Sequence, residues 1–261
     1  MHEIDVDELL DIIKNDEIEE YLIKITGIEP NELYKITHFE LQQLIKNKFR
    51  IRPDQKEKLK DALFQDANEE ETIAVFASAL LDKNEIKDLI KIENNFKSET
   101  YVNLIIATGN VEEYLTSEII KASNMDGYEV VGLIKATGNI EKYLTPEIIE
   151  AFNMGGYEVT KLIKATGNIE KYLTPEIIEA FNMNVNQVTE LIEATGNIGK
   201  YLTPEIIEAS NMDGYEVAGL IKATRNIGKY LTPEIIEASN MTGYQVAKLI
   251  EGNIEKYLTP R

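Results

Sequence analysis

The sequence predicts an all-α protein, an α-solenoid made of tandem 29-residue helical repeats that follow an N-terminal helical cap. The first observation is a Leu-Ile pair that recurs 29 residues apart, at Leu104, Leu133 and Leu162, and continues to residue 249. The second is that residues 133–154 and 162–183 are identical. The third is that apolar residues in each copy follow the helical period while prolines stand at helix-starting positions, which excludes a β-solenoid.

The first helix of a copy is predicted at residues 128–137. Val130, Leu133 and Ile134 have the i, i+3, i+4 spacing of one helical face. Gly138 and Asn139 follow, and both residue types tolerate the left-handed conformation that ends a helix. We therefore expect the helix to stop there, before a short turn that contains Tyr143.

The second helix of a copy is predicted to begin at Thr145-Pro146-Glu147. Threonine caps a helix, proline suits its first position, and glutamate interacts favourably with the positive end of the helix dipole. Ile148 and Ile149 open its apolar stripe. Helices of about ten residues are marginal alone in water, so each must bury its stripe against neighbouring copies.

The chain is predicted to have two domains. Residues 1–103 form an N-terminal helical cap with degenerate repeats, because helical patterns run through 6–25, 30–49, 54–64 and 70–81. Residues 104–261 hold about 5.4 tandem copies. No strand is expected in either domain.

Composition argues against an enzyme and against a cofactor or metal site. The chain has no cysteine and only two histidines, and its paired carboxylates recur along the repeat as solvated helix faces do. No glycine-rich phosphate loop follows a strand. No apolar run approaches the roughly 18 residues that cross a bilayer, and the N-terminus is acidic rather than basic. A cytoplasmic location is expected, with delivery into a host cell left open.

Variation between copies concentrates at the turn between the two helices, beside a series of tyrosines. A repeat array presents its variable positions along one ridge, so these residues are the candidate partner-binding site; drift at exposed loops is the alternative. The candidate residues are Asp126, Gly127, Tyr128, Gly155, Gly156, Tyr157, Asn184, Val185, Asn186, Asp213, Gly214, Tyr215, Thr242, Gly243 and Tyr244.

A basic stretch interrupts the acidic head of the chain. A solvated helix face is one interpretation of it, and contact with an anion or phosphate is the other. The cations concerned are Lys46, Lys48, Arg50, Arg52, Lys56, Lys58 and Lys60.

The second helix and the variable pair together resemble the transcription activator-like effector repeat. Residues 144–151 read Leu-Thr-Pro-Glu-Ile-Ile-Glu-Ala, and a variable pair and another helix follow. The resemblance implies a superhelix around DNA in which Gly127, Gly156, Val185, Gly214 and Gly243 face bases. Tyr157-Glu158 stands where the family has phosphate-binding residues, and the repeat is shorter than the family's.

The partner class follows from charge. The formal net charge is −19, and the repeat array has 13 basic and 22 acidic residues, which disfavours wrapping around a duplex. The favoured function is a non-enzymatic repeat scaffold that binds a protein partner through the variable turns. Nucleic-acid binding of the activator-like type is the first alternative, and an acidic mimic of DNA is the second. No membrane partner is expected.

Overall fold

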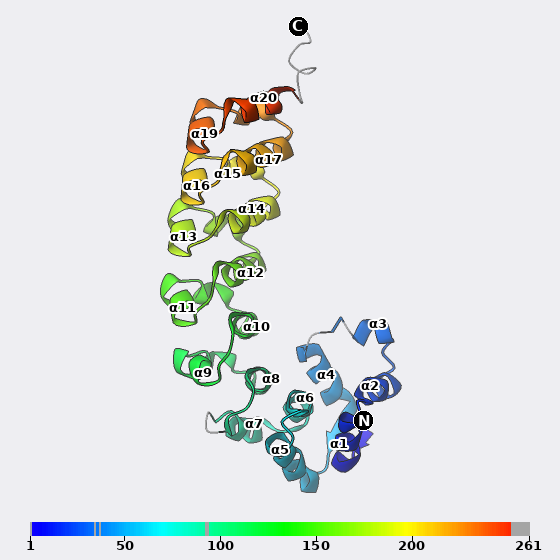
Figure 1. Cartoon of the computed structure of the whole chain (residues 1–261). Coiled ribbons are helices and arrows are strands. Elements are labelled where there is room, and N and C mark those ends of the chain that lie inside the picture. The colour runs from blue at the N-terminus through cyan, green and yellow to red at the C-terminus, as the bar shows by residue number, and fades with distance from the viewer. Residues whose placement is uncertain (1, 34, 37, 92–93, 252–261) are drawn as a thin grey trace. The chain divides into compact units, whose positions relative to one another are not determined.

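The structure is a computed structural model, and it describes residues 2–33, 35–36, 38–91 and 94–251 (Figure 1). It confirms the all-α prediction, because nearly all regular structure in these residues is helical. The chain divides into two compact units: an N-terminal unit, Met1–Asn139, and a C-terminal unit, Ile140–Arg261. The predicted boundary between 103 and 104 marks the start of the regular repeat and stays a prediction.

The N-terminal unit consists of helices of unequal length and two short strands. Its elements are β1 (His2–Ile4), α1 (Val6–Lys14), α2 (Ile18–Thr26), α3 (Pro30–Leu33), α4 (His38–Lys48), β2 (Phe49–Ile51), the 3₁₀ helix η1 (Pro53–Gln55), α5 (Lys56–Gln65), α6 (Glu70–Leu80), α7 (Lys83–Leu89), α8 (Ser98–Thr108), the 3₁₀ helix η3 (Val111–Glu113), α9 (Ser117–Ala122) and α10 (Gly127–Ala136).

Helix α6 is the centre of the N-terminal unit. It packs against α4, α5 and α8, and also contacts α1 and β2. Ile73, Ala74, Phe76 and Ala77 on it are almost wholly buried. A helix that is apolar on all sides is expected to lie inside a core. Residues 73–77 of α6 are all apolar, so its central position agrees with its sequence.

Two expectations about this unit were wrong in detail. Strands β1 and β2 pair in parallel, with His2 opposite Phe49, where no strand was expected. The pair buries Ile4 and Phe49, which explains why it forms although each strand has only three residues. The helical pattern over 6–25 is not continuous but forms two helices, since Asp16 adopts a left-handed φ of 59° between α1 and α2.

The C-terminal unit repeats one set of elements along the chain. They are η4 (Ile140–Tyr143), α11 (Pro146–Ala151), α12 (Gly156–Thr166), η5 (Ile169–Tyr172), α13 (Pro175–Ala180), α14 (Val185–Ala194), α15 (Ile198–Tyr201), α16 (Pro204–Ala209), α17 (Gly214–Thr224), α18 (Ile227–Tyr230), α19 (Pro233–Ala238) and α20 (Gly243–Glu251). The incomplete copy after Glu251 lies outside the described residues.

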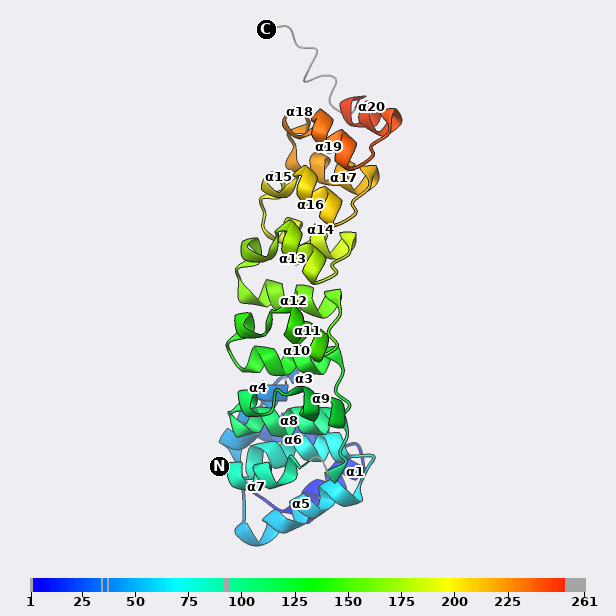
Figure 2. The same ribbon diagram turned by 90° about the vertical axis from the view of Figure 1, so that its left-hand side faces the viewer.

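Equivalent helices of successive copies pack on one another within this unit. The short helix α16 contacts both α13 and α19, and the longer helices pair as α12 with α14, α14 with α17, and α17 with α20. Figures 1 and 2 show the short helices in one row and the longer helices in another. The variable turns join the two rows.

The start and end signals predicted from the sequence act as expected. The hydroxyl of Thr174 accepts a hydrogen bond from the backbone N–H of Ile177, and Pro175 is the first residue of α13. Gly167 ends α12 with a left-handed φ of 69°. The stripe of the short helix is corrected in the first two copies of this unit, where Ile149 and Ile178 are buried and the preceding isoleucines are half-exposed. In the last copy the order is reversed, because Ile235 is buried and Ile236 is half-exposed.

Candidate functional site

The first residue of each variable pair is the N-cap of the longer helix that follows. Oδ1 of Asp213 accepts hydrogen bonds from the backbone N–H groups of Tyr215, at 2.6 Å, and Glu216, at 3.3 Å. Asn184 accepts one from the N–H of Gln187 at 3.2 Å. The residues at this position, Asp126, Gly155, Asn184, Asp213 and Thr242, all belong to the favoured N-cap types. Helix capping therefore accounts for much of the variation at this position.

The second residue of each pair lies towards the next copy. A Cβ atom on Gly156 would overlap the end of the Gln187 side chain, and one on Gly214 would lie 2.7 Å from Oε1 of Gln245 and 2.9 Å from the Cα of Met241. These glycines permit close packing between copies. Val185 is half-buried, Gly127 is half-buried, and Gly243 is exposed.

The third position is the outermost of the candidate residues. Tyr128, Tyr157, Tyr215 and Tyr244 are 46–72% exposed, and Asn186, at the same position in α14, is also exposed. By contrast, Tyr143, Tyr172 and Tyr201 of the other tyrosine series are buried. We call Tyr157, Asn186, Tyr215 and Tyr244 of the C-terminal unit the tyrosine ridge.

Two tyrosines of the ridge carry a lysine of their own helix on the ring. Nζ of Lys161 lies 4.7 Å from the ring centroid of Tyr157, and Nζ of Lys248 lies 5.6 Å from that of Tyr244. These are cation–π distances. The fourth residue after Tyr215 is instead Gly219, where an added Cβ would meet no atom within 4 Å. Sequence reasoning missed this feature, although the spacing of four residues from tyrosine to lysine or glycine could have indicated it.

A pocket of about 380 Å³ lies next to the turn that precedes Tyr215. Ala238 contributes apolar surface above the buried Ile207 and Met212, and Glu208 and Asp213 contribute carboxylates. Ser239 also lines the pocket.

Copies differ in the side chain at the position of Ser239. Phe152 and Phe181 occupy it in the two earlier copies of the unit and are buried. Ser239 is buried as well, and its hydroxyl donates to the carbonyl of Ile235 at 2.7 Å. The smaller serine leaves space that phenylalanine would fill.

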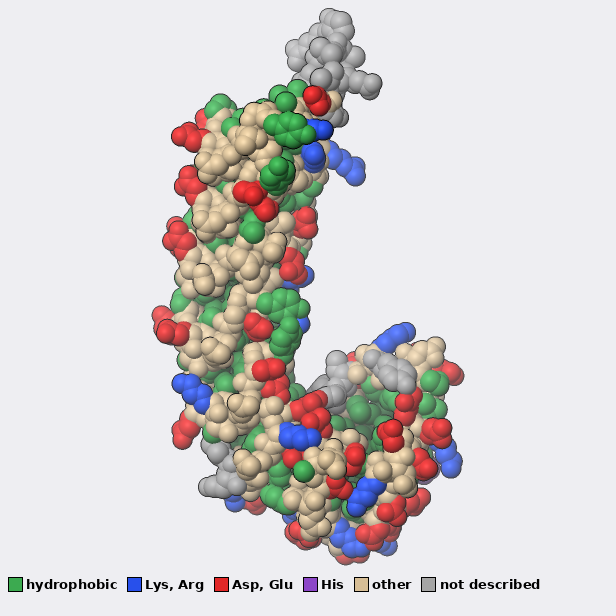
Figure 3. Space-filling view, viewed as in Figure 1, with side chains coloured by type: hydrophobic (Ala, Val, Ile, Leu, Met, Phe, Trp, Pro, Cys, Tyr) green, Lys and Arg blue, Asp and Glu red, His purple; other side chains and the backbone are tan. Residues whose placement is uncertain are grey.

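The carboxylates at this turn have shifted pKa values. A hydrogen bond from the Glu216 side chain, helped by the backbone N–H of Tyr215, holds the pKa of Asp213 below its usual value. The same contact with Asp213, with some burial, raises the pKa of Glu216. Asp213 is therefore a carboxylate at neutral pH beside the pocket. Acidic side chains also recur along the visible face of the C-terminal unit (Figure 3).

The basic stretch of the head does not form one helix face. It extends from the end of α4 through β2 and η1 into α5. Most of its cations pair with acidic residues of the N-terminal unit: Arg50 with Glu3, Arg52 with Glu3, Asp5 and Asp54, Lys56 with Asp82 and Glu85, Lys58 with Asp7, and Lys60 with Glu57 and Glu85. Within the described residues, Lys46 and Lys48 have no such pair.

Two further features are absent from the described part of the chain. There, no three His, Asp or Glu side chains are grouped to hold a metal ion. Over the same residues, no helix combines the length and the apolar character that a membrane span needs. Comparisons of the chain with protein families, curated proteins and solved structures find no match.

Proposed function

We propose that the protein is a non-enzymatic α-solenoid scaffold that binds a protein partner along the tyrosine ridge, and that the bound segment carries lysine or arginine. The observation that carries the proposal is the exposed tyrosine near the start of successive longer helices, most exposed at Tyr215, with an exposed fraction of 72%. Large aromatic side chains in contact with water are characteristic of binding hot spots.

The solenoid part of the proposal rests on helix lengths and packing. Helix α13 has six residues and α14 has ten, too few for stability in isolation. Both bury their stripes against the equivalent helices of neighbouring copies. Mutual burial between identical units is the physical basis of a repeat architecture.

The chemistry of the partner follows from the ridge itself. Lys161 and Lys248 show that the faces of these tyrosines accept an amine. The ring of Tyr215 has Gly219 in place of that lysine, so a cation from the partner can occupy its face. The acidic array attracts a basic segment by the same electrostatics that repel a nucleic acid.

The pocket beside Asp213 fits the side chain of an arginine or lysine. Its aliphatic part would contact Ala238, and its charged end would reach Glu208 and Asp213. Amphipathic cations bind in this way, with the stem on apolar surface and the head on carboxylates. The copy around Tyr215 is thus the proposed anchor of the partner.

The two alternative functions, DNA binding of the activator-like type and mimicry of DNA, would require other roles for these residues. In the activator-like interpretation, Gly156 and Gly214 face bases, yet both glycines lie where the next copy packs. An acidic mimic of DNA would need its carboxylates rather than its tyrosines. Neither alternative has a specific observation in its favour.

Direct binding to defined probes separates these three functions. The full chain is titrated into a fluorescently labelled peptide of arginine and glycine, a glutamate–glycine peptide and a DNA duplex, at low and high salt. We expect only the arginine peptide to bind, more weakly as salt rises. Stronger binding to duplex DNA would favour the nucleic-acid alternative, and failure of the arginine peptide to bind would refute the proposal.

A single substitution tests the open ring. Gly219→Lys supplies Tyr215 with a lysine as in the copies of Tyr157 and Tyr244, so affinity for the arginine peptide should fall about fivefold to tenfold. Gly219→Ala is the matched control and should leave affinity unchanged. Tyr215→Ala should weaken binding while Tyr215→Phe retains it. Equal affinities for all four variants would show that the ridge does not contact the peptide.

A further inference from the structure

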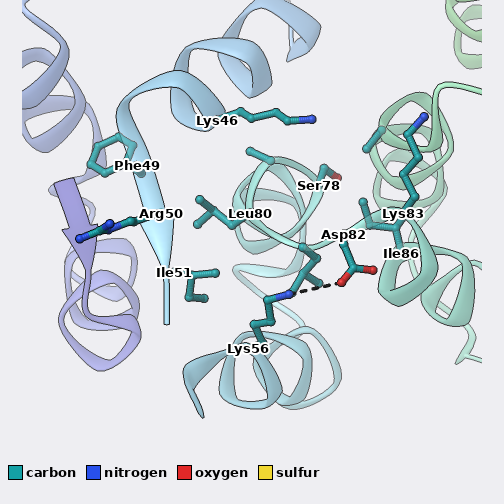
Figure 4. Close-up of a pocket in the computed structure, with 13 residues that line it drawn as sticks. Lys46, Phe49, Arg50, Ile51, Lys56, Ser78, Leu80, Asp82, Lys83 and Ile86 are labelled. Carbon is teal, nitrogen blue, oxygen red and sulfur yellow. Dashed lines mark hydrogen bonds and ion pairs between the residues drawn. The ribbon is translucent and has the colours of Figure 1, made fainter. Parts of the chain in front are cut away.

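A second concave site lies in the N-terminal unit, among α4, β2, α5, α6 and α7. Its volume is about 420 Å³, within the range of small-molecule pockets (Figure 4). Four cations line it, Lys46, Arg50, Lys56 and Lys83, against the one carboxylate of Asp82. That excess of positive charge is notable in a chain whose formal net charge is −19.

Two of these cations are already neutralised. Nζ of Lys56 lies 2.8 Å from Glu85 and 3.4 Å from Asp82. Arg50 pairs with Glu3 at 3.6 Å, and in Figure 4 its guanidinium points towards the strands and away from the pocket. These two residues therefore line the pocket, but their charges are already paired with carboxylates.

The other two cations, Lys46 and Lys83, are free to bind. Both are exposed, and within the described residues neither has an acidic partner. In Figure 4 Lys46 extends from α4 and Lys83 from α7 on either side of Ser78, which belongs to α6. A pair of unpaired amines around a cavity is suited to an anion with more than one charge.

Ser78 supplies an independent observation. It lines the pocket from α6, is only 7% exposed, and its Oγ has no hydrogen-bond partner among the described residues. Leaving a buried hydroxyl without a partner is unfavourable, and such groups are rare in folded proteins. An oxygen atom of a ligand would satisfy it.

We propose that this pocket binds a small organic phosphate. The phosphate lies between Lys46 and Lys83 and accepts a hydrogen bond from Ser78, and the organic part packs on the half-exposed Ile51 and Leu80. A phosphate ester has two charges for the two lysines and several oxygens to accept hydrogen bonds, whereas a carboxylate has one charge. The site is independent of the tyrosine ridge.

Calorimetric titration of the full chain with four probes tests the ligand class. Phenyl phosphate combines the charge with an apolar body, inorganic phosphate has only the charge, phenol has only the body, and benzoate has one charge. We expect phenyl phosphate to bind most tightly, inorganic phosphate more weakly, and phenol not at all. Absence of heat with phenyl phosphate, or benzoate equal to phenyl phosphate, would overturn the proposal.

Substitutions locate the site. Replacing both Lys46 and Lys83 with glutamine should weaken phenyl phosphate at least about tenfold. The matched control replaces Lys121 and Lys135, which are exposed on α9 and α10 of the same unit, and changes net charge equally. An equal loss of affinity in both double variants would show that the effect comes from overall charge, and would refute the site.

Ser78→Ala separates binding from folding. Alanine removes a hydroxyl that has no partner and favours a helix, so the thermal midpoint of the unliganded protein should hold or rise. Affinity for phenyl phosphate should nonetheless fall about threefold to tenfold. A variant with unchanged affinity would show that Ser78 does not contact the ligand.

Discussion

The two units of the chain bury their apolar residues in different ways. In the N-terminal unit one helix, α6, is surrounded by α4, α5 and α8, and its neighbours differ from one another in length and sequence. In the C-terminal unit the helices contact their own equivalents, as α16 does with α13 and α19. The difference means that a substitution at the centre of the N-terminal unit affects many elements, whereas one in the C-terminal unit affects a copy and its neighbours.

We expect the largest effect on folding from the deletion of part of a copy. Deleting residues 162–190 removes one 29-residue period, so the flanking copies can pack together as before and the C-terminal unit should fold. Deleting only 162–175 removes the second half of α12, all of η5 and the Thr174-Pro175 start of α13, and should abolish folding of that unit. Circular dichroism and thermal denaturation of both variants provide the measurement. If the two deletions fold equally well, the copy is not the structural unit.

The next effect is a substitution at the centre of the N-terminal unit. Phe76 on α6 is 1% exposed, so Phe76→Ala should cost about 3–5 kcal/mol of unfolding free energy. Chemical denaturation measures this cost. Hydrogen exchange of the native variant should show lower protection throughout α4, α5 and α8. Protection lost from α6 alone would contradict the central position given to this helix.

A buried isoleucine of the C-terminal unit should have a more local effect. Ile178→Ala should cost about 2–5 kcal/mol, because Ile178 is fully buried. Ile177→Ala should cost less because Ile177 is half-exposed, and Glu179→Ala should cost little because Glu179 is exposed. Hydrogen exchange should lose protection mainly in α13 and the helices that contact it. Equal costs for Ile177 and Ile178 would show that the short helix is rotated from its observed position.

Local signals made much of the C-terminal unit predictable from its sequence. Thr174 and Pro175 begin a helix and Gly167 ends one through interactions within a few residues, so short sequence patterns contain the information. Burial was harder to assign. Ile148 and Ile149 are adjacent and equally apolar, and only the position of the next copy decides which is covered.

The N-terminal unit was less predictable because its decisive contacts join distant residues. His2 pairs with Phe49, and the cations of the basic stretch find partners such as Glu85 and Asp7 that no local pattern identifies. Ser78 was not among the candidate residues for the same reason. A serine in an apolar helix gives no sign that a pocket with two free lysines lies beside it.

Loss of a helix cap should have a smaller effect that tests the role of the variable turns. Asp213→Ala removes the acceptor for two backbone N–H groups of α17, so it should cost about 0.5–2 kcal/mol. Asp213→Asn should cost less, since Asn184 caps α14 in the preceding copy. Chemical denaturation measures both. An Asp213→Ala variant as stable as the natural chain would leave the choice of Asp, Asn, Thr or Gly at this turn without a structural reason.

The smallest expected effect is on stability at acidic pH, and it distinguishes the two ends of the short helices. Hydrogen bonds from its own backbone N–H and then from the hydroxyl of Thr174 hold the pKa of Glu176 below its usual value of 4.5. Glu147, Glu205 and Glu234 are lowered by the same causes. A depressed folded-state pKa stabilises the protein above the unfolded-state value, and this contribution is lost as pH falls through the folded-state value.

Replacing these four glutamates with glutamine should therefore flatten the decline in thermal stability of the C-terminal unit below about pH 4.5. The matched control places glutamine at Glu150, Glu179, Glu208 and Glu237, near the other end of the same helices. A negative charge is unfavourable there, so these changes should raise stability at neutral pH instead. If both sets change the pH profile alike, the effect comes from total charge, and the repeated Thr-Pro-Glu start contributes nothing through its carboxylate.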